Sequence, residues 1–134
     1  MPLSYTGIRV TNLDRSMRFY VEHLGLVEQK RGTMSHGGHW VSLRDPESNV
    51  ELELNYYPPA SPYARPYSPG EGLDHLGFDV SDARAAIERM RAQGVRVAVE
   101  PWLEEGRSWI GFVEDPDGNW IELQSPVRPA DRGL

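Results

Sequence analysis

Two stretches of the chain carry apolar residues at the three- and four-residue spacing of an amphipathic helix. They are NLDRSMRFYVEHLGL, residues 12–26, and SDARAAIERMRAQGV, residues 81–95. Both begin with short polar residues that cap helices and end at a glycine, which tolerates the positive φ of a helix end. The predicted caps are Asn12 or Asp14 in the first helix and Ser81 or Asp82 in the second, and the predicted stops are Gly25 and Gly94.

Short runs rich in Val, Ile, Leu and aromatic residues surround each predicted helix and are typical of strands. One run precedes each helix and three follow it. The predicted strands cover residues 5–10, 26–32, 39–45 and 49–57 in the first half, and 73–80, 95–101, 108–115 and 119–125 in the second. The order of elements is therefore βαβββ in both halves.

The two halves match at an offset of about seventy residues, which indicates a duplicated module rather than a solenoid. Asp45-Pro46-Glu47 corresponds to Asp115-Pro116-Asp117, and VELEL corresponds to NWIEL. We expect an α+β protein in which two βαβββ modules form a paired half-barrel sheet around a cleft. The predicted organisation is one domain over residues 1–134, with modules 4–57 and 73–125, a Pro-rich linker 58–72 and a tail 126–134.

The amino-acid composition limits the kinds of partner that the protein is expected to bind. The 134 residues carry a net charge of −6, and 39% are apolar and 25% charged, as in ordinary globular proteins. This acidity argues against nucleic acid or an anionic membrane as the partner. The absence of cysteine excludes disulfides, thiolate zinc sites and a cysteine nucleophile. No signal-peptide pattern or apolar run of about 18 residues is present, so we expect a cytoplasmic protein that binds a small molecule.

Polar residues interrupt otherwise apolar strands at equivalent places in the two halves. Glu122 lies between Ile121 and Leu123, and Glu53 or Glu51 occupies the corresponding strand of the first half. His75 lies within LDHLGF, and Tyr5 occupies the matching first-half position. Duplication predicts that these side chains converge around a pseudo-twofold axis.

A carboxylate left unpaired inside a protein costs several kcal/mol, so buried carboxylates are usually paired, hydrogen-bonded or bound to metal. One glutamate on a strand is often solvated, and one histidine is often merely packed. Together, at equivalent positions, Glu53, His75 and Glu122 favour a site for Zn, Ni, Co, Mn or Fe. The alternation of side chains along the strand does not distinguish Glu51 from Glu53, because both lie on the same face. Glu53 is preferred as the ligand because the segment ELNYY follows from it.

The segments YTGIRVTNLDRSMRFYVEHLGL, ELNYY, LDHLGFDV and GFVEDPDGNWIEL resemble the vicinal oxygen chelate superfamily, which comprises glyoxalases, bleomycin resistance proteins and dioxygenases, and within it the glyoxalase I (lactoylglutathione lyase) branch. The resemblance covers about residues 4–125. It implies the paired-module fold, a homodimer, and metal ligands at Glu53, His75 and Glu122. It further implies metal-assisted proton abstraction next to a carbonyl, with Glu122 as the proton-shuttling base and Arg9 on the substrate.

Tyr5 departs from this pattern, because glyoxalase I has His or Gln at that position as a metal ligand. A phenol, with an ordinary pKa near 10, is a poor ligand unless the metal lowers that pKa. Tyr5 therefore stands as a ligand, as a hydrogen-bond partner of a bound water, or as packing. A second difference from the family pattern lies beside His75. The chain has no obvious second basic residue there and instead has two acidic residues, Glu71 and Asp74.

Further candidates surround the predicted site. Tyr57 and Trp120 are expected to line the substrate pocket, and His36 or His39 offers a substitute ligand. Two other kinds of function remain open at this level. One is a different reaction of the same superfamily, such as epimerisation or ring cleavage by a dioxygenase. The other is a non-catalytic binding protein of the antibiotic-resistance type, which does not need three metal ligands.

Overall fold

The computed structural model describes residues 1–35 and 37–132, which fold as two compact units, Met1–Ser68 and Pro69–Leu134. In the first unit the elements are β1 (Thr6–Arg9), α1 (Leu13–Arg18), a π-helical turn (Phe19–His23), β2 (Val27–Thr33), β3 (His39–Arg44) and β4 (Glu51–Tyr56). In the second they are β5 (His75–Asp79), α2 (Ala83–Ala92), β6 (Val97–Glu104), β7 (Ser108–Glu114), β8 (Trp120–Pro126) and a 3-10 turn (Pro129–Arg132).

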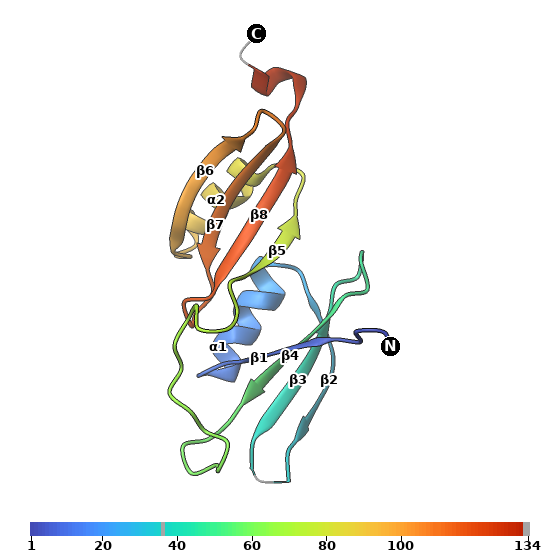
Figure 1. Cartoon of the computed structure of the whole chain (residues 1–134), viewed down its shortest axis with the longest axis vertical. Helices are drawn as coiled ribbons and strands as arrows, with labels where there is room; N and C mark the ends of the chain where they lie inside the picture. The colour runs from blue at the N-terminus through green and yellow to red at the C-terminus, as the bar shows by residue number, and fades with distance from the viewer. Residues whose placement is uncertain (36, 133–134) are drawn as a thin grey trace. The chain divides into compact units, whose positions relative to one another are not determined.

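Each unit contains one four-stranded sheet with the same topology (Figure 1). The strand order is β1-β4-β3-β2 in the first unit and β5-β8-β7-β6 in the second. In both, the first strand pairs in parallel with the last, and the other pairs are antiparallel. The prediction of an α+β protein built from two βαβββ modules is confirmed.

The register of the two sheets repeats residue by residue around the predicted glutamates. Gly7 pairs with Glu53 across β1 and β4, and Gly77 pairs with Glu122 across β5 and β8. On the antiparallel side, Glu53 faces Ser42 and Glu122 faces Phe112. The strand register therefore makes Glu53, and not Glu51, the counterpart of Glu122.

The helix caps agree with one of the two predicted choices in each module. The Asn12 side chain accepts a hydrogen bond from the Arg15 backbone N–H at 2.9 Å, and Asp82 accepts one from Ala85 at 3.1 Å. Such caps satisfy N–H groups that have no partner within the helix. At the other ends, the backbone takes positive φ at Gly25 (76°) and Gly94 (89°), as the glycine stops predict.

The first helix differs from a plain α-helix because its second half is a π-helical turn. There the backbone N–H of Leu24 bonds to the carbonyl of Phe19, five residues earlier, at 3.3 Å. Two adjacent aromatic residues, Phe19 and Tyr20, are both buried in this turn and meet edge to face. Apolar periodicity alone does not distinguish a wide turn of this kind from an α-helix.

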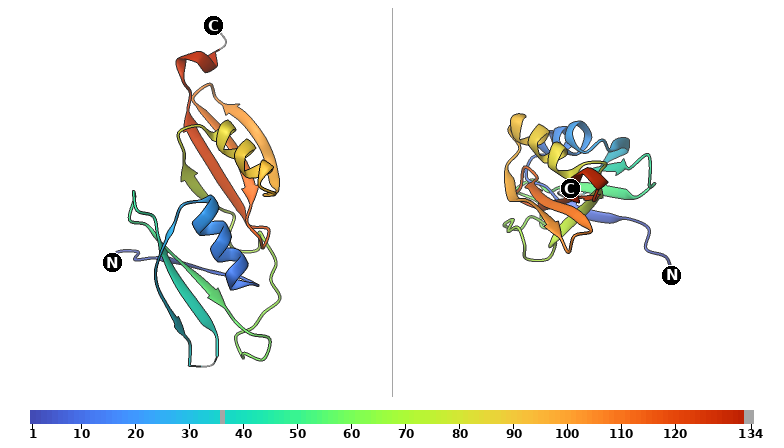
Figure 2. Two further views of the ribbon diagram at one scale, coloured as in Figure 1. Left: turned by 180° about the vertical axis from the view of Figure 1, so that it is seen from behind. Right: turned by 90° about the horizontal axis from the view of Figure 1, so that it is seen from above.

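Each sheet has one apolar face covered by its helix and one face that carries the polar candidates. Leu52, Leu54, Ile121 and Leu123 are buried on β4 and β8, and the glutamates alternate with them. Successive side chains of a strand point to opposite faces, so the glutamates lie on the face away from the helix. The helix α2 lies across one face of its sheet in the left view of Figure 2. We call the other face of each sheet its open face.

The C-terminal turn is held against the start of α2 by ion pairs. The Arg84 guanidinium donates to Asp131, and Arg128 lies 2.8 Å from the Asp82 carboxylate. The backbone N–H of Arg128, and then the Arg84 guanidinium, lower the pKa of Asp131. Since this pKa is lower in the folded chain, its stabilising contribution is present at neutral pH and is lost as the pH falls through the folded-state pKa. Over the described residues, no helix has the length and apolar character required to cross a membrane.

Candidate functional site

His75 and Glu122 meet on the open face of the second unit. The His75 Nε2 atom lies 3.6 Å from Glu122 Oε2. Parallel pairing of β5 with β8 causes this approach, because His75 pairs with Trp120 and so lies two residues away from the pair of Gly77 and Glu122. The side chain of Glu122 is 19% exposed and that of His75 is 37% exposed, so both groups remain accessible to a ligand.

Asp74 holds the other ring nitrogen of His75. Its Oδ1 atom lies 2.7 Å from His75 Nδ1. A carboxylate in this position can accept a hydrogen bond from the Nδ1–H group of a neutral imidazole, which leaves the lone pair on Nε2; this arrangement is usual in metal-ligating histidines. The sequence indicated only that Asp74 adds negative charge near His75; it did not predict this contact.

Aromatic rings surround His75 on the same face. Phe112 meets the imidazole edge to face, with ring centroids 5.5 Å apart. Trp120 and Trp102 flank Phe112 with centroid distances of 5.2 and 6.1 Å, and Trp120 is 42% exposed. Phe112, Trp120 and Trp102 thus form an aromatic wall beside His75, and the expectation that Trp120 lines the substrate pocket remains a prediction. The sequence reasoning missed Phe112, although it faces Glu122 in the antiparallel register.

The open face of the first unit carries Glu53, Glu51 and the residue preceding β1, Tyr5. Glu51 accepts a 2.5 Å hydrogen bond from Ser42 Oγ. Within residues 1–35 and 37–132, the carboxylate of Glu53 forms no hydrogen bond or ion pair, and Tyr5 is 49% exposed. Glu53 therefore has its oxygens available for a ligand, and the Glu51 carboxylate is already engaged.

Arg9 and Tyr57, the predicted substrate residues of the first half, contact each other. The Arg9 guanidinium lies over the Tyr57 ring at 4.3 Å from its centroid, and its Nη1 donates to the Tyr63 carbonyl at 2.7 Å. A cavity of about 400 Å³ is lined by Arg9, Tyr57 and Arg65 of the Pro-rich segment, among others. Arg65 supplies a second positive charge to this cavity, which the sequence did not associate with Arg9.

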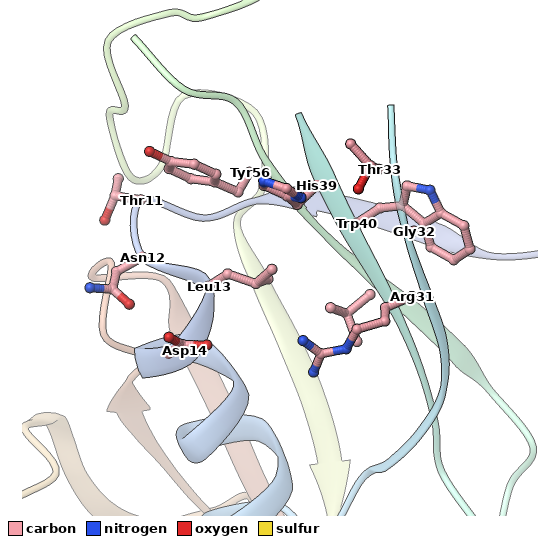
Figure 3. Close-up of a pocket in the computed structure, with 11 residues that line it drawn as sticks. Thr11, Asn12, Leu13, Asp14, Arg31, Gly32, Thr33, His39, Trp40 and Tyr56 are labelled. Atoms are coloured by element: carbon pink, nitrogen blue, oxygen red, sulfur yellow. The ribbon is translucent and has the colours of Figure 1, made fainter. Parts of the chain in front are cut away.

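A second cavity, of about 630 Å³, lies at the start of α1 on the helix-covered face of the first sheet (Figure 3). His39 and Tyr56 stack beside it, with centroids 6.4 Å apart and planes at 9°. None of the predicted metal ligands lines this cavity. His39 thus lines a cavity that Glu53 does not line, and His36, the other predicted substitute ligand, lies outside the described residues.

The predicted metal set draws two residues from each unit. Over the described parts of the chain, no three His, Cys, Asp or Glu side chains gather as a ready metal cluster. The structure brings His75 and Glu122 together and leaves the carboxylate of Glu53 without a partner among the described residues. The assignment of Glu53, His75 and Glu122 as ligands, with Tyr5 as a further ligand or as a neighbour of the ion, remains a prediction.

The fold defines a class of proteins, those built from two βαβββ modules that each form a four-stranded sheet. The model of the Glyoxalase/Bleomycin resistance protein/Dioxygenase superfamily matches residues 3–123. The chain belongs to this superfamily, and within it is an enzyme of the glyoxalase I type.

Related proteins and solved structures support the same family assignment. The lactoylglutathione lyase of Haemophilus influenzae is 34% identical over 92% of this chain and 91% of its own. That of Salmonella typhimurium is 32% identical over all of this chain and 98% of its own. The trypanothione-dependent glyoxalase I of Leishmania major matches with a TM-score of 0.76 and 33% identity, over 93% of this chain and 86% of that one. Enzymes of this type are in general metal-dependent and act on small molecules.

Proposed function

We propose that the protein catalyses a lactoylglutathione lyase-type isomerisation, in which a proton moves between adjacent carbons beside a carbonyl of a small oxygenated substrate. The observation that carries the proposal is the approach of His75 Nε2 to Glu122 Oε2 at 3.6 Å, on a face with accessible side chains. The lactoylglutathione lyases related over nearly the whole chain support the reaction type.

The donor atoms fit a divalent ion. Two ligands that each lie about 2.0–2.2 Å from one ion are separated by about the distance found between His75 and Glu122. The other imidazole nitrogen is held by Asp74. In the first module, Glu53 occupies the position equivalent to Glu122, and its carboxylate has no partner within residues 1–35 and 37–132. We infer that Glu53, His75 and Glu122 hold Zn, Ni, Co, Mn or Fe, with Tyr5 beside them. When bound, the ion acts as a Lewis acid that polarises neighbouring substrate oxygens.

Glu122 acts as the base in this proposal. Its carboxylate accepts the proton from the carbon next to the carbonyl and returns it to the adjacent carbon. The aromatic wall of Phe112 and Trp120 excludes water from one side of the substrate, which strengthens electrostatic interactions at the reacting atoms. Arg9 and Tyr57 bind the remote part of the substrate, where the guanidinium offers hydrogen bonds to a carboxylate.

The product name of the relatives defines the substrate chemically. A lactoyl thioester is an isomer of the adduct of a thiol with methylglyoxal. The carbon-bound proton leaves the thiol-bearing carbon and returns to its neighbour, while the hydroxyl proton passes between the two oxygens. No oxidant or further reactant enters, so a single base and a polarising ion suffice.

The direct test is incubation of the purified protein with methylglyoxal and a thiol, with separate assays for glutathione and trypanothione. Formation of the lactoyl thioester, without consumption of oxygen, supports the proposal. Absence of the product with every thiol contradicts it. Oxygen-dependent cleavage of a catechol would instead assign a dioxygenase, and inversion of a chiral carbon would assign an epimerase.

Two substitutions at Tyr5 test its role. Tyr5→His is expected to tighten metal binding, because it places a neutral imidazole at the position equivalent to His75. Tyr5→Phe is expected to leave metal occupancy nearly unchanged, since the exposed ring then loses only a hydroxyl outside the ligand set. Both are measured by metal analysis after dialysis. Loss of metal from Tyr5→Phe would make the phenol itself a ligand, and no change in either variant would remove position 5 from the site.

We also propose a homodimeric cytoplasmic protein, organised as one domain whose modules are joined by the Pro-rich segment. In the part of the chain that the structure describes, β1 and β2 are the edge strands of one sheet and β5 and β6 those of the other, and each pairs on one side only. Natural proteins pair or cover such edges. The net charge of −6 disfavours nucleic acid and anionic membranes as alternative partners.

Mixing two inactive variants distinguishes a site shared by two chains from a site within one chain. If Glu53 of one chain joins His75 of its partner, a dimer of Glu53→Gln with His75→Ala contains one intact site. Random reassembly of equal amounts is then expected to restore about a quarter of wild-type activity, since half the dimers are mixed and each has one site of two. If both residues act within one chain, no intact site forms and activity stays at the level of the parents.

A further inference from the structure

Asp74 forms the most specific polar contact of His75 within the described residues. Its Oδ1 atom is 2.7 Å from Nδ1, and the opposite nitrogen, Nε2, is the atom that approaches Glu122. The two ring nitrogens of an imidazole are not equivalent, because in the neutral ring one carries the proton and the other the lone pair. The group that contacts Nδ1 therefore determines whether Nε2 carries the proton or the lone pair.

We propose that Asp74 is a positioning residue: it fixes the proton of neutral His75 on Nδ1 and directs the Nε2 lone pair toward the site shared with Glu122. This inference deepens the proposed function and rests on it only for the identity of the ligand that Nε2 binds. Asp74 itself does not contact the reacting atoms.

The surroundings of the ring support this role. Phe112 meets the imidazole through an edge-to-face ring contact and provides no hydrogen-bond acceptor for Nδ1. Glu122 lies on the Nε2 side. Asp74 is therefore the acceptor present at Nδ1 among the described residues. Its side chain is 91% exposed, so replacing it removes the contact with little disturbance of packing.

The contact also explains why the acidic residue adjacent to His75 is compatible with a metal site. A carboxylate bound to the outer nitrogen raises the basicity of the ligating nitrogen and fixes the orientation of the ring. Loss of such a partner typically costs 10–100-fold in metal affinity. For the exposed contact here we expect the lower end of that range.

The test compares Asp74→Ala with Asp79→Ala, a matched control on the last residue of β5. Asp79 has the same charge and accepts a hydrogen bond from Gln124 instead of contacting His75. The first readout is ¹⁵N NMR of the neutral His75 ring in metal-free full-length protein. The wild type and Asp79→Ala are expected to carry the proton on Nδ1, and Asp74→Ala to show a mixture of the two tautomers.

The second readout is titration of the same proteins with Co²⁺ alone. Asp74→Ala is expected to bind Co²⁺ about tenfold more weakly than the wild type, and Asp79→Ala equally well. A wild-type ring protonated on Nε2, an unchanged tautomer in Asp74→Ala, or an equal loss of affinity in Asp79→Ala overturns the inference. If the wild type binds no Co²⁺ while Asp74 still sets the tautomer, the metal-dependent function fails and the positioning role stands.

Discussion

Replacing Glu122 by Gln is expected to lower kcat by about 10²–10⁴-fold, the range that a positioned acid–base group contributes. The amide retains the shape of the side chain but cannot accept the substrate proton. The measurement is the initial rate of lactoyl thioester formation at saturating metal, which separates loss of the base from loss of a ligand. Circular dichroism confirms that the variant is folded.

Glu114→Gln is the matched control for Glu122→Gln. Glu114 lies on the neighbouring strand β7, carries the same charge, and lies 3.6 Å from Arg96. We expect this variant to retain wild-type activity, because Glu114 has no part in the proposed chemistry. Equal rates for Glu122→Gln and the wild type would remove Glu122 from the reaction.

Replacing His75 by Ala is expected to weaken divalent-metal affinity by at least about 100-fold, since removal of a direct ligand costs more than removal of its supporting group. The His75 side chain is only partly buried, with 37% of it exposed, so the fold is expected to persist. His39→Ala, in the cavity at the start of α1, is the control and retains the metal. Stoichiometric metal in dialysed His75→Ala would rule out the proposed ligand set.

The duplicated architecture was predictable from sequence because each module repeats the same order of periodicities. Strands alternate over short runs and helices place apolar residues three and four apart, and both patterns occur twice with glycine stops. The position of Gly25 and the cap at Asn12 follow from local backbone chemistry, which short-range sequence encodes. The π-helical turn at Phe19–His23 was not predictable, since it depends on how two adjacent aromatics pack into the core.

The sequence predicted which residues belong to the candidate site better than it predicted the contacts that these residues form. Alternation left Glu51 and Glu53 equivalent; the strand register aligns Glu53 with Glu122, and the bond from Ser42 engages Glu51. From the sequence, Asp74 could be recognised only as a negative charge near His75, because its contact with the ring depends on the side-chain orientation of His75. Arg65 reaches the cavity of Arg9 through a segment without helix or strand, where sequence periodicity provides no guidance.

If the protein is a metal-dependent isomerase of the lactoylglutathione lyase type, its activity depends on a bound divalent ion. The most direct measurement is the rate of lactoyl thioester formation from methylglyoxal and glutathione by one protein sample before chelation, after chelation and after return of a divalent ion. We expect activity that is lost on chelation and regained with Zn²⁺, Ni²⁺, Co²⁺, Mn²⁺ or Fe²⁺. Product formation at an undiminished rate in metal-stripped protein, or none under any of these conditions, would contradict it.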